Sequence, residues 1–463
     1  MAKSIAVFGG SFNPAGVHHR AVALALAEHF DETFVVLCGP RPDKPPTNDI
    51  EPIHRAVMAD MAFRGIPKVR VEMFDLENAT FTRTHALEER YRLHGDVWHV
   101  VGTDLIKGGK DGASDIQAKW QGGAALWREL QFVVIVRDGY PLDDADLPPK
   151  SRVLHVGASG SSKAIRDRVY DRQSIDGLVS SDVAAYIKRY NLYRGAVPPR
   201  SAELKLADPK AFIVHDPLNP KAVALATRFS DFGVSIENAN CILSIGGDGT
   251  MLHAIREHWR LRLPFVGLNA GHRGYLLNDI DDAELQDPLF LFSQLRVHQL
   301  PQLRIDYTDM QGTPYGMYAF NDALAKSSNF QAAWLKVIVD NETRIEKFVG
   351  DGVLVSTAAG STSYATAMGA SPMLVDAQAW LIVGDNVFHP KGWKAAQMSL
   401  MSEVRIESLD YRKRPIILGV DGVHCGEVPG FKARVSKIAS IELAFSPHRD
   451  LAKKLADDVF PPR

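Results

Sequence analysis

Cysteine is scarce in this chain. The 463 residues contain three cysteines, Cys38, Cys241 and Cys425, and none has a partner at the C-x-x-C spacing of zinc and redox sites. Long apolar runs are also missing, since no segment approaches the roughly 18 apolar residues that span a bilayer. The apolar-leaning run at the start is too short for a signal peptide. We therefore predict a cytoplasmic protein that has reduced cysteines and does not bind a membrane.

An excess of charge of one sign is absent as well. Lys and Arg total 53 against 55 for Asp and Glu, which gives a formal net charge of −2. Proteins that bind nucleic acids through their overall charge are usually basic, so no nucleic-acid partner is expected and any anion site must be local. A chain of this length exceeds one usual core and predicts roughly two to four folding units.

Short β-branched runs alternate with helical patterns over the first two hundred or so residues. The alternation predicts a parallel sheet with crossover helices, hence an α/β domain over 1–195. The expected strands are 4–8, 33–37, 68–72, 97–101 and 132–136, with helices that include 17–30, 53–63 and 182–190.

Glycine and two prolines near residue 198 end that pattern and predict a linker over 196–207. A second α/β segment is expected over 208–296, with strands at 211–215, 241–245 and 265–268 and helices at 221–229 and 250–258. A β-rich segment is expected over 297–463, with strands that include 303–307, 335–339, 344–348, 352–356, 403–407 and 416–420. Asp340 and Asn341 lie at a predicted hairpin turn.

Two glycine-rich loops follow predicted strands. In the second, Gly246, Gly247, Asp248, Gly249 and Thr250 place one carboxylate between glycines. Missing side chains allow backbone N–H groups to close on an anion, and the acid can coordinate a cation or accept a proton from an attacking hydroxyl. The first loop, which runs from Gly9 to Pro14, lies far upstream. Two such loops predict two nucleotide reactions.

The upstream loop leads into a helix whose first turn carries His18 and His19. A second helix is predicted to begin at Ser161 and Ser162, with Arg166 one turn later. Helix N-termini attract anions, and arginine binds phosphate through a planar fork of donors. We expect both helix starts to face one nucleotide. The alternatives are that Ser161 is an ordinary helix cap and that the histidines are solvated.

GGSFNP followed by histidines, with SSKAIR later, resembles the nicotinate or nicotinamide mononucleotide adenylyltransferases of the HxGH superfamily over about residues 3–193. The resemblance implies a Rossmann-like nucleotidyltransferase domain with His18 and His19 as catalytic residues. It implies ATP and phosphate binding by Gly9, Gly10, Ser11, Phe12, Lys44, Ser161, Ser162 and Arg166. It implies mononucleotide binding by Thr82, Gly102, Asp104, Trp120 and Arg137, although Trp120 could instead be a packing aromatic.

One motif position departs from that family. Gly16 stands where its first histidine is expected, and His18 replaces its glycine. The substrate phosphate itself attacks ATP in this chemistry, so the protein supplies orientation and charge stabilisation. Loss of one donor could therefore weaken the reaction without abolishing it, and His18 could substitute from the next position.

The second loop and three later runs resemble the NAD kinases over about residues 208–450. The runs are NAGHRGYL at 269–276, Asn321-Asp322, and Asp351-Gly352 leading into STAAGSTSY at 356–364. The resemblance implies an NAD kinase-like α/β domain with a β-rich C-terminal domain. It also implies that the protein forms a homo-oligomer through this kinase part. Asp248 would be the base, and Gly246, Gly247, Gly249 and Thr250 would hold ATP phosphates. The implied NAD-binding residues are Asn269, Asn321, Asp322, Asp351, Thr357, Gly360, Ser361, Thr362 and Tyr364.

That family usually has glutamate at the position of Asp322 and T-P-T-G where Thr357-Ala358-Ala359-Gly360 runs. Aspartate is one methylene shorter, so its contact could shift or pass through water. These departures leave the groups needed for phosphoryl transfer in place, and they leave affinity and cofactor preference open.

Together the resemblances predict a bifunctional enzyme of NAD(P) biosynthesis. It would make a dinucleotide from ATP and nicotinamide or nicotinate mononucleotide, and would phosphorylate NAD to NADP with ATP as co-substrate and Mg²⁺ as cofactor. The sequence does not identify the metal ligands. One alternative is an NAD kinase with a non-catalytic nucleotide-sensing N-terminal domain. Another is fusion to a lipid kinase, since GGDGT occurs there too, but NAGHRGYL and STAAGSTSY speak against it.

Overall fold

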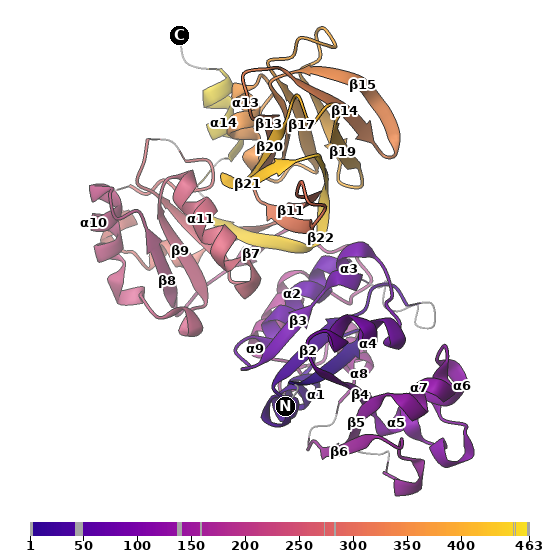
Figure 1. The fold of residues 1–463 in the computed structure, drawn as a ribbon. Coiled ribbons are helices and arrows are strands. Elements are labelled where there is room, and N and C mark those ends of the chain that lie inside the picture. Colours follow the sequence, from indigo (N-terminus) through magenta and orange to yellow (C-terminus); the bar gives the residue numbers. More distant parts are fainter. Residues whose placement is uncertain are drawn as a thin grey trace. The chain divides into compact units, whose positions relative to one another are not determined.

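The computed structural model describes residues 3–41, 50–136, 141–157, 160–272, 274–281, 284–447, 449 and 451–460. The chain forms two compact units, Met1–Pro199 and Arg200–Arg463 (Figure 1). Residues 196–207 are not all linker, because Ser201–Leu204 form strand β7 of the second unit and pair with its strand β11 (Leu295–Thr308).

The first unit is built on a parallel sheet with the strand order β3-β2-β1-β4-β5-β6. The predicted α/β class is confirmed, and one strand that was not predicted, β6, adds an edge. The strands are β1 (Ser4–Gly10), β2 (Glu32–Leu37), β3 (Val69–Glu72), β4 (Asp96–Gly102), β5 (Gln131–Val136) and β6 (Ser151–His155). The helices are α1 (Val17–His29), α2 (Pro52–Phe63), α3 (Phe74–Asn78), α4 (Thr84–Arg92), α5 (Thr103–Ile106), α6 (Asp115–Lys119), α7 (Gly123–Glu129), α8 (Ser162–Tyr170) and α9 (Ser181–Arg189).

The order of strands in this sheet reverses between β1 and β4, which are neighbours. Connections from the two strands run in opposite directions at such a point, so the loops beyond their carboxyl ends diverge and leave a crevice. The loop Gly9–Pro14 follows β1, and helix α5 follows β4. The fold therefore places the upstream glycine loop at a crevice that can bind a ligand.

The second unit contains a mixed sheet and a fully antiparallel sheet. The mixed sheet has the order β15-β14-β19-β22-β10-β9-β8, with β11, β12 and β7 branching from it, and the antiparallel sheet has the order β18-β17-β16-β13-β20-β21. The mixed-sheet strands not yet given are β8 (Ala211–His215), β9 (Cys241–Gly246), β10 (Phe265–Asn269), β12 (Pro314–Ala319), β14 (Ala333–Val339), β15 (Glu342–Gly350), β19 (Glu403–Ser408) and β22 (Gly430–Phe445). The antiparallel strands are β13 (Asp322–Ser327), β16 (Gly352–Ser356), β17 (Ala379–Asp385), β18 (Ala395–Ser399), β20 (Ile416–Val420) and β21 (Val423–Val428).

The division expected at residues 296 and 297 is not a boundary, because it falls inside strand β11. Strand β22 pairs with β19 at its start and with β10 at its end, so one sheet continues from the β-rich part into the α/β part. The helices of the second unit are α10 (Pro220–Arg228), α11 (Asp248–His258), α12 (Phe290–Ser293), α13 (Tyr364–Ala367) and α14 (Leu451–Val459). The predicted turn at Asp340 and Asn341 is confirmed, with φ of 52° and 66° at the two residues.

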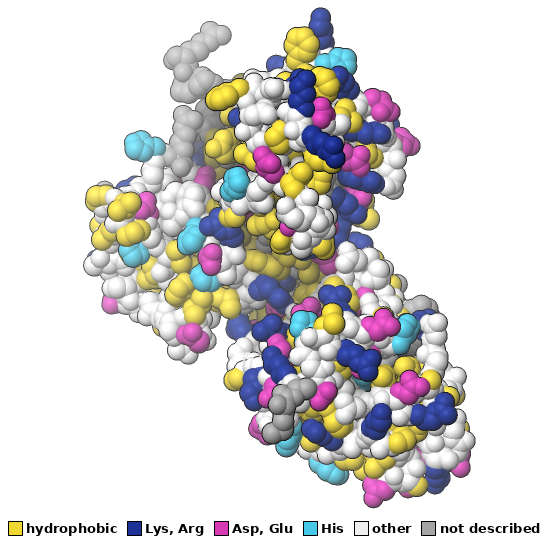
Figure 2. All heavy atoms as spheres, viewed as in Figure 1, with side chains coloured by type: hydrophobic (Ala, Val, Ile, Leu, Met, Phe, Trp, Pro, Cys, Tyr) yellow, Lys and Arg dark blue, Asp and Glu magenta, His cyan; other side chains and the backbone are white. Residues whose placement is uncertain are grey.

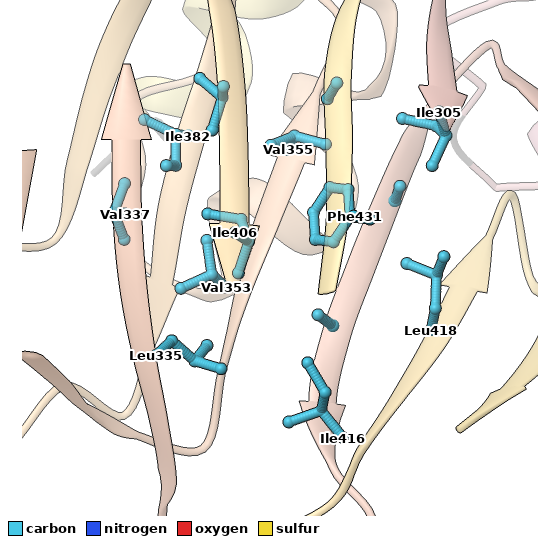
Figure 3. Close-up of a cluster of buried hydrophobic side chains, with 14 of the residues drawn as sticks. Ile305, Leu335, Val337, Val353, Val355, Ile382, Ile406, Ile416, Leu418 and Phe431 are labelled. Carbon is cyan, nitrogen blue, oxygen red and sulfur yellow. The ribbon is translucent and has the colours of Figure 1, made fainter. Parts of the chain in front are cut away.

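A large apolar cluster of this unit lies between its two sheets (Figure 3). Leu335, Val337 and Ile406 come from the mixed sheet, and Val353 and Val355 come from the antiparallel sheet. Burying apolar surface contributes about 25 cal/mol of stability per Å², and this burial holds such facing sheets together.

The charged side chains on the surface reflect the near-equal numbers of acidic and basic residues in the sequence (Figure 2). Acidic and basic side chains are interspersed over each unit on the face in view (Figure 2). In the part of the chain that the structure describes, no helix has both the length and the apolar character needed to cross a membrane.

Replacing Phe348 by alanine should destabilise the second unit by about 3–5 kcal/mol, because a large apolar side chain would leave a cavity. Phe348 is 0% exposed, whereas Phe330 is fully exposed and offers a matched control. The free energies of unfolding can be measured by urea denaturation. Phe330→Ala should change stability by less than about 0.5 kcal/mol. Equal losses in the two variants would contradict the assigned core.

Candidate active sites

A cavity of about 990 Å³ lies at the crevice of the first unit. Its lining includes most of the residues predicted for adenylyl transfer, namely Gly9, Gly10, Ser11, Phe12, His18, His19, Thr82, Asp104, Trp120, Ser161, Ser162 and Arg166. Gly102 is buried directly before α5 and is not part of the lining. Lys44 and Arg137 lie outside the described residues.

Helix α8 docks its first turn onto the upstream glycine loop. Arg166 Nη1 donates to the carbonyl of Asn13 at 2.7 Å, and Ser162 Oγ donates to the carbonyl of Pro14 at 2.9 Å. Ser161 caps the helix by accepting the N–H of Ala164 at 3.1 Å. The structure thus brings the two helix starts to one cavity, where first-turn N–H groups attract anions.

Sequence reasoning missed Arg55, which holds the same loop from inside the fold. Its Nε and Nη2 donate to the carbonyl of Ser11 at 3.0 and 2.7 Å, and Nη2 also donates to the carbonyl of Cys38 at 2.7 Å. The side chain is buried, and burial lowers the pKa of its guanidinium. An arginine within the apolar run of α2 was the available signal, since a buried charge requires partners.

The histidine pair has a defined geometry. His19 Nδ1 accepts the N–H of Gly16 at 3.1 Å, so a neutral His19 carries its proton on Nε2 and can donate to a phosphate oxygen. The ring centres of His18 and His19 are 4.0 Å apart. A Cβ on Gly16 would lie 2.7 Å from the His18 ring, so this placement of His18 requires glycine at position 16.

Thr82, another lining residue, is held by Asp75, a buried residue of the lining that sequence reasoning also missed. Asp75 Oδ1 accepts the Thr82 hydroxyl at 2.7 Å, and Oδ2 accepts the Thr82 N–H at 2.8 Å. Trp120 is half-buried and packs against the core around Trp127, so it both packs and lines the cavity. Asp104 is exposed in the first turn of α5.

In the second unit, Asp248 is the first residue of α11. Its Oδ2 accepts the N–H of Tyr275 and its Oδ1 accepts the N–H of Leu276, both at 2.9 Å. Burial raises the pKa of Asp248, and these N–H groups together with nearby cations oppose the rise. The result is an oriented carboxylate that is more basic than an exposed one.

The glycines beside Asp248 differ in their surroundings. A Cβ on Gly247 or Gly249 would meet no atom within 4 Å, which leaves space for a ligand next to the backbone. A Cβ on Gly246 would lie 2.3 Å from Thr250 Oγ1, so those two residues pack against each other.

A narrow cavity of about 20 Å³ lies next to this carboxylate. Its lining includes Tyr275, Leu276, Thr362, Arg449 and Lys454. Thr357 lines a neighbouring cavity of about 30 Å³. Each has room for about one water, so a dinucleotide can enter only if side chains move.

The segment around Gly360 supports the cavity mainly through backbone contacts. Ser361 Oγ donates to the carbonyl of Ala358 at 2.6 Å and accepts the N–H of Met373 at 2.8 Å. A Cβ on Gly360 would lie 2.3 Å from the carbonyl oxygen of Asn321, so only glycine permits this approach. Asn321 Oδ1 is buried without a hydrogen-bond partner among the described residues. A donor group of a ligand could satisfy this oxygen.

Of the nine residues predicted to bind NAD, Thr362 lines the cavity beside Asp248 and Thr357 lines its neighbour. The other seven are not among the lining residues, namely Asn269, Asn321, Asp322, Asp351, Gly360, Ser361 and Tyr364. Asn269 Nδ2 donates to Asp279 at 2.6 Å, and its Oδ1 accepts the N–H of Gly271 at 2.9 Å, so it holds a loop. Asp351 accepts from Asn386 at 2.7 Å and lies at the end of β16 opposite Thr357, about 20 Å away by strand rise. Tyr364 is largely exposed at the start of α13.

No group of three or more His, Cys, Asp or Glu side chains that could hold a metal ion occurs within the described ranges. Asp248 keeps a second lone pair on each oxygen, so it could join a metal whose other ligands are phosphate oxygens and water.

Comparisons with known proteins match each unit separately. Residues 7–173 match the cytidylyltransferase-like family, and residues 225–287 match the ATP-NAD kinase N-terminal domain family. The chain joins a cytidylyltransferase-like domain to an NAD kinase domain.

Relatives of the NAD kinase domain cover the latter half of the chain. The NAD kinase of Cereibacter sphaeroides is 29% identical over 238 residues, which are 51% of this chain and 92% of the relative. The NAD kinase of Xanthomonas campestris pv. campestris is 28% identical over 255 residues, which are 55% and 98% of the two chains. A crystal structure of yeast NADH kinase complexed with NADH aligns with a TM-score of 0.49 and 16% identity, covering 57% of this chain and 92% of that one.

The NAD kinase domain also buries two neighbouring acids, of which sequence reasoning found one. Asp421 accepts the N–H groups of Phe320, Asn321 and Asp322 at 2.7, 2.8 and 3.0 Å. Burial raises the pKa of Asp421, but its three donors favour the ionised form. Burial and the charge of Asp421 raise the pKa of Asp322 to about 7, so Asp322 is the acid that holds the proton.

Replacing Asp322 by asparagine should stabilise the NAD kinase domain at high pH. The folded domain binds the Asp322 proton more tightly than the unfolded chain, whose pKa is near 3.8. The stability contributed by the protonated acid is complete below the unfolded pKa and is lost as the pH rises through about 7. The stability gained by Asp322→Asn should therefore grow by on the order of 2 kcal/mol between about pH 5 and 8.

Thermal melting at both pH values measures this difference. Asp421→Asn is the contrasting variant and should destabilise at both pH values, because it loses an acceptor for backbone N–H groups. A difference between Asp322→Asn and wild type that stays constant with pH would contradict the assignment.

Proposed function

We propose that the protein is a bifunctional enzyme of NAD(P) biosynthesis. The first domain would join ATP to nicotinamide or nicotinate mononucleotide, releasing pyrophosphate, and the second would phosphorylate the ribose 2′-hydroxyl of NAD. The second activity is supported by relatives named NAD kinase that align over 92–98% of their own length. The first is supported by one observation, the meeting of the glycine loop, the histidines and helix α8 at one large cavity.

Asp248 would act as the base in the kinase reaction. The ribose 2′-hydroxyl gives its proton to the carboxylate as its oxygen attacks the γ-phosphorus of ATP, and the bond to the bridging oxygen of ADP breaks. The N–H groups of Tyr275 and Leu276 keep the carboxylate in one orientation during this step. Mg²⁺, bound mainly by the ATP phosphates, would supply charge neutralisation there.

Adenylyl transfer needs no protein nucleophile. A phosphate oxygen of the mononucleotide attacks the α-phosphorus of ATP, and pyrophosphate leaves with the electrons of the broken bond. His19 through its Nε2–H, Arg166 and the start of α8 are the groups that would bind the phosphates and stabilise the developing charge. The dinucleotide formed is the substrate class of the NAD kinase domain, which supports this choice among nucleotidyl transfers.

Asp248→Asn should lower NADP formation from NAD and ATP by about 10²–10⁴-fold, because the amide cannot accept the hydroxyl proton. Mass spectrometry of the product measures the rate, and pyrophosphate release serves as the internal control. His19→Ala should give the reverse pattern, with pyrophosphate release from ATP and mononucleotide reduced by about 10–10³-fold and NAD phosphorylation retained. If Asp248→Asn made NADP at the wild-type rate, another residue would have to be the base.

Gly16 and His18 should behave as a reciprocal pair. Gly16→His alone clashes with the His18 ring, and His18→Gly alone removes an imidazole, so each should lower pyrophosphate release by at least about tenfold. The double variant restores the His-x-Gly-His order and removes the clash with the His18 ring, but a Cβ at position 16 would still lie 2.9 Å from the carbonyl oxygen of Leu178. It should therefore recover part of the activity. Full activity in His18→Gly alone would remove His18 from the mechanism.

The alternative of a nucleotide-sensing domain makes a different prediction for the wild-type protein. A sensor binds ATP or mononucleotide and releases no pyrophosphate. Assaying the full chain with both mononucleotides, ATP and Mg²⁺ distinguishes the two functions.

A further inference from the structure

The C-terminal segment returns to the loop that holds Asp248. Arg449 Nη2 donates to the carbonyls of Gly274 and Tyr275 at 2.9 and 3.0 Å. Lys454 Nζ, from α14, donates to the carbonyl of Gly274 at 2.6 Å and to Asp279 at 3.0 Å. Two cations therefore hold one loop, and the N–H groups of that loop orient the proposed catalytic carboxylate.

The two cations differ in how fully they are satisfied. Lys454 has a carboxylate partner in Asp279. Arg449 has two further nitrogens, Nε and Nη1, that are buried and have no hydrogen-bond partner in the described part of the chain. These nitrogens carry three N–H groups. A buried donor without a partner destabilises the fold, and more so when it is charged, so this arrangement is unfavourable unless a ligand completes it.

The position of Arg449 identifies the chemistry of that ligand. The residue lines the narrow cavity together with Tyr275, Leu276 and Thr362, next to Asp248. Asp248 would repel an approaching phosphate, and a nearby guanidinium offsets that repulsion. A cavity of about 20 Å³ holds roughly one water, which could satisfy only part of the three N–H groups. A phosphate group offers several charged oxygens to a guanidinium, and it can enter once the neighbouring side chains move.

We propose that Arg449 binds a phosphate group, from either ATP or the dinucleotide, in the cavity beside Asp248. This inference rests on the proposed kinase function and adds to it a binding residue from the C-terminal segment, outside the runs that resemble the family. The guanidinium would hold the phosphate next to the base and neutralise negative charge during transfer.

The test uses the full chain carrying Arg449→Gln, and compares affinities for NAD, ATP and adenosine. Arg449→Gln should weaken binding of at least one phosphate-bearing ligand by tenfold or more and change the affinity for adenosine by less than about twofold. Calorimetry measures NAD and ATP separately, and the ligand that loses affinity is the source of the phosphate. Ligand-observed NMR measures adenosine. Arg449→Lys should recover only part of the affinity, because a lysine is a point charge without the planar fork.

Arg228→Gln is the matched control, because Arg228 also donates to a backbone carbonyl, that of Leu285 at 3.1 and 2.9 Å, and does not line the cavity. It should affect all three ligands to a similar, small extent. The inference is overturned if Arg449→Gln binds NAD and ATP with wild-type affinity, if adenosine binding falls equally, or if Arg228→Gln reproduces the selective loss. A wild-type protein that makes no NADP would instead refute the proposed kinase function, whereas NADP formation at equal rates by wild type and Arg449→Gln would refute this inference alone.

Discussion

The NAD kinase domain depends on one contact, in which the carboxylate of Asp248 accepts the N–H groups of Tyr275 and Leu276. This contact ties the start of α11 to the loop that follows β10, so two elements beyond the ends of adjacent parallel strands share one acid. Burial of the acid raises its pKa, and the donated N–H of Leu276 opposes that rise. The contact therefore fixes the orientation of the proposed base, whereas burial makes it more basic than an exposed carboxylate.

The two candidate sites share one local architecture but differ in the volume of the cavity beside it. In each, a glycine loop follows a parallel strand and leads into a helix, so backbone N–H groups converge where an anion can bind. The cavity of the first unit measures about 990 Å³, whereas the one beside Asp248 measures about 20 Å³. The first has room for a nucleotide-sized ligand as it stands. The second would have to open to admit one, and side chains of the C-terminal segment would be among those that move.

Several buried charges hold loops in place beside the two candidate sites. Arg55 donates to the carbonyl of Ser11, and Asp75 accepts from Thr82. Asp421 accepts three successive backbone N–H groups, the last of which belongs to Asp322. A buried charge is costly unless it is hydrogen-bonded, so each of these contacts strongly favours one loop conformation. Their role is to position the residues beside them, and none belongs to a recognisable motif.

The sequence by itself determined the local features of this protein. Apolar periodicity located five of the six strands of the first sheet, glycine spacing located both loops, and the residue types at Ser161 and at Asp340-Asn341 identified a helix cap and a hairpin turn. These features depend on neighbours along the chain, which the sequence displays directly. Only the tertiary structure decided that β22 joins the α/β and β-rich parts. It also decided that Asn269 and Asp351 bond other side chains and do not line the cavity beside Asp248, whereas Arg449 does. Those outcomes depend on hydrogen bonds between residues far apart in the chain, and residue type and spacing do not specify such partners.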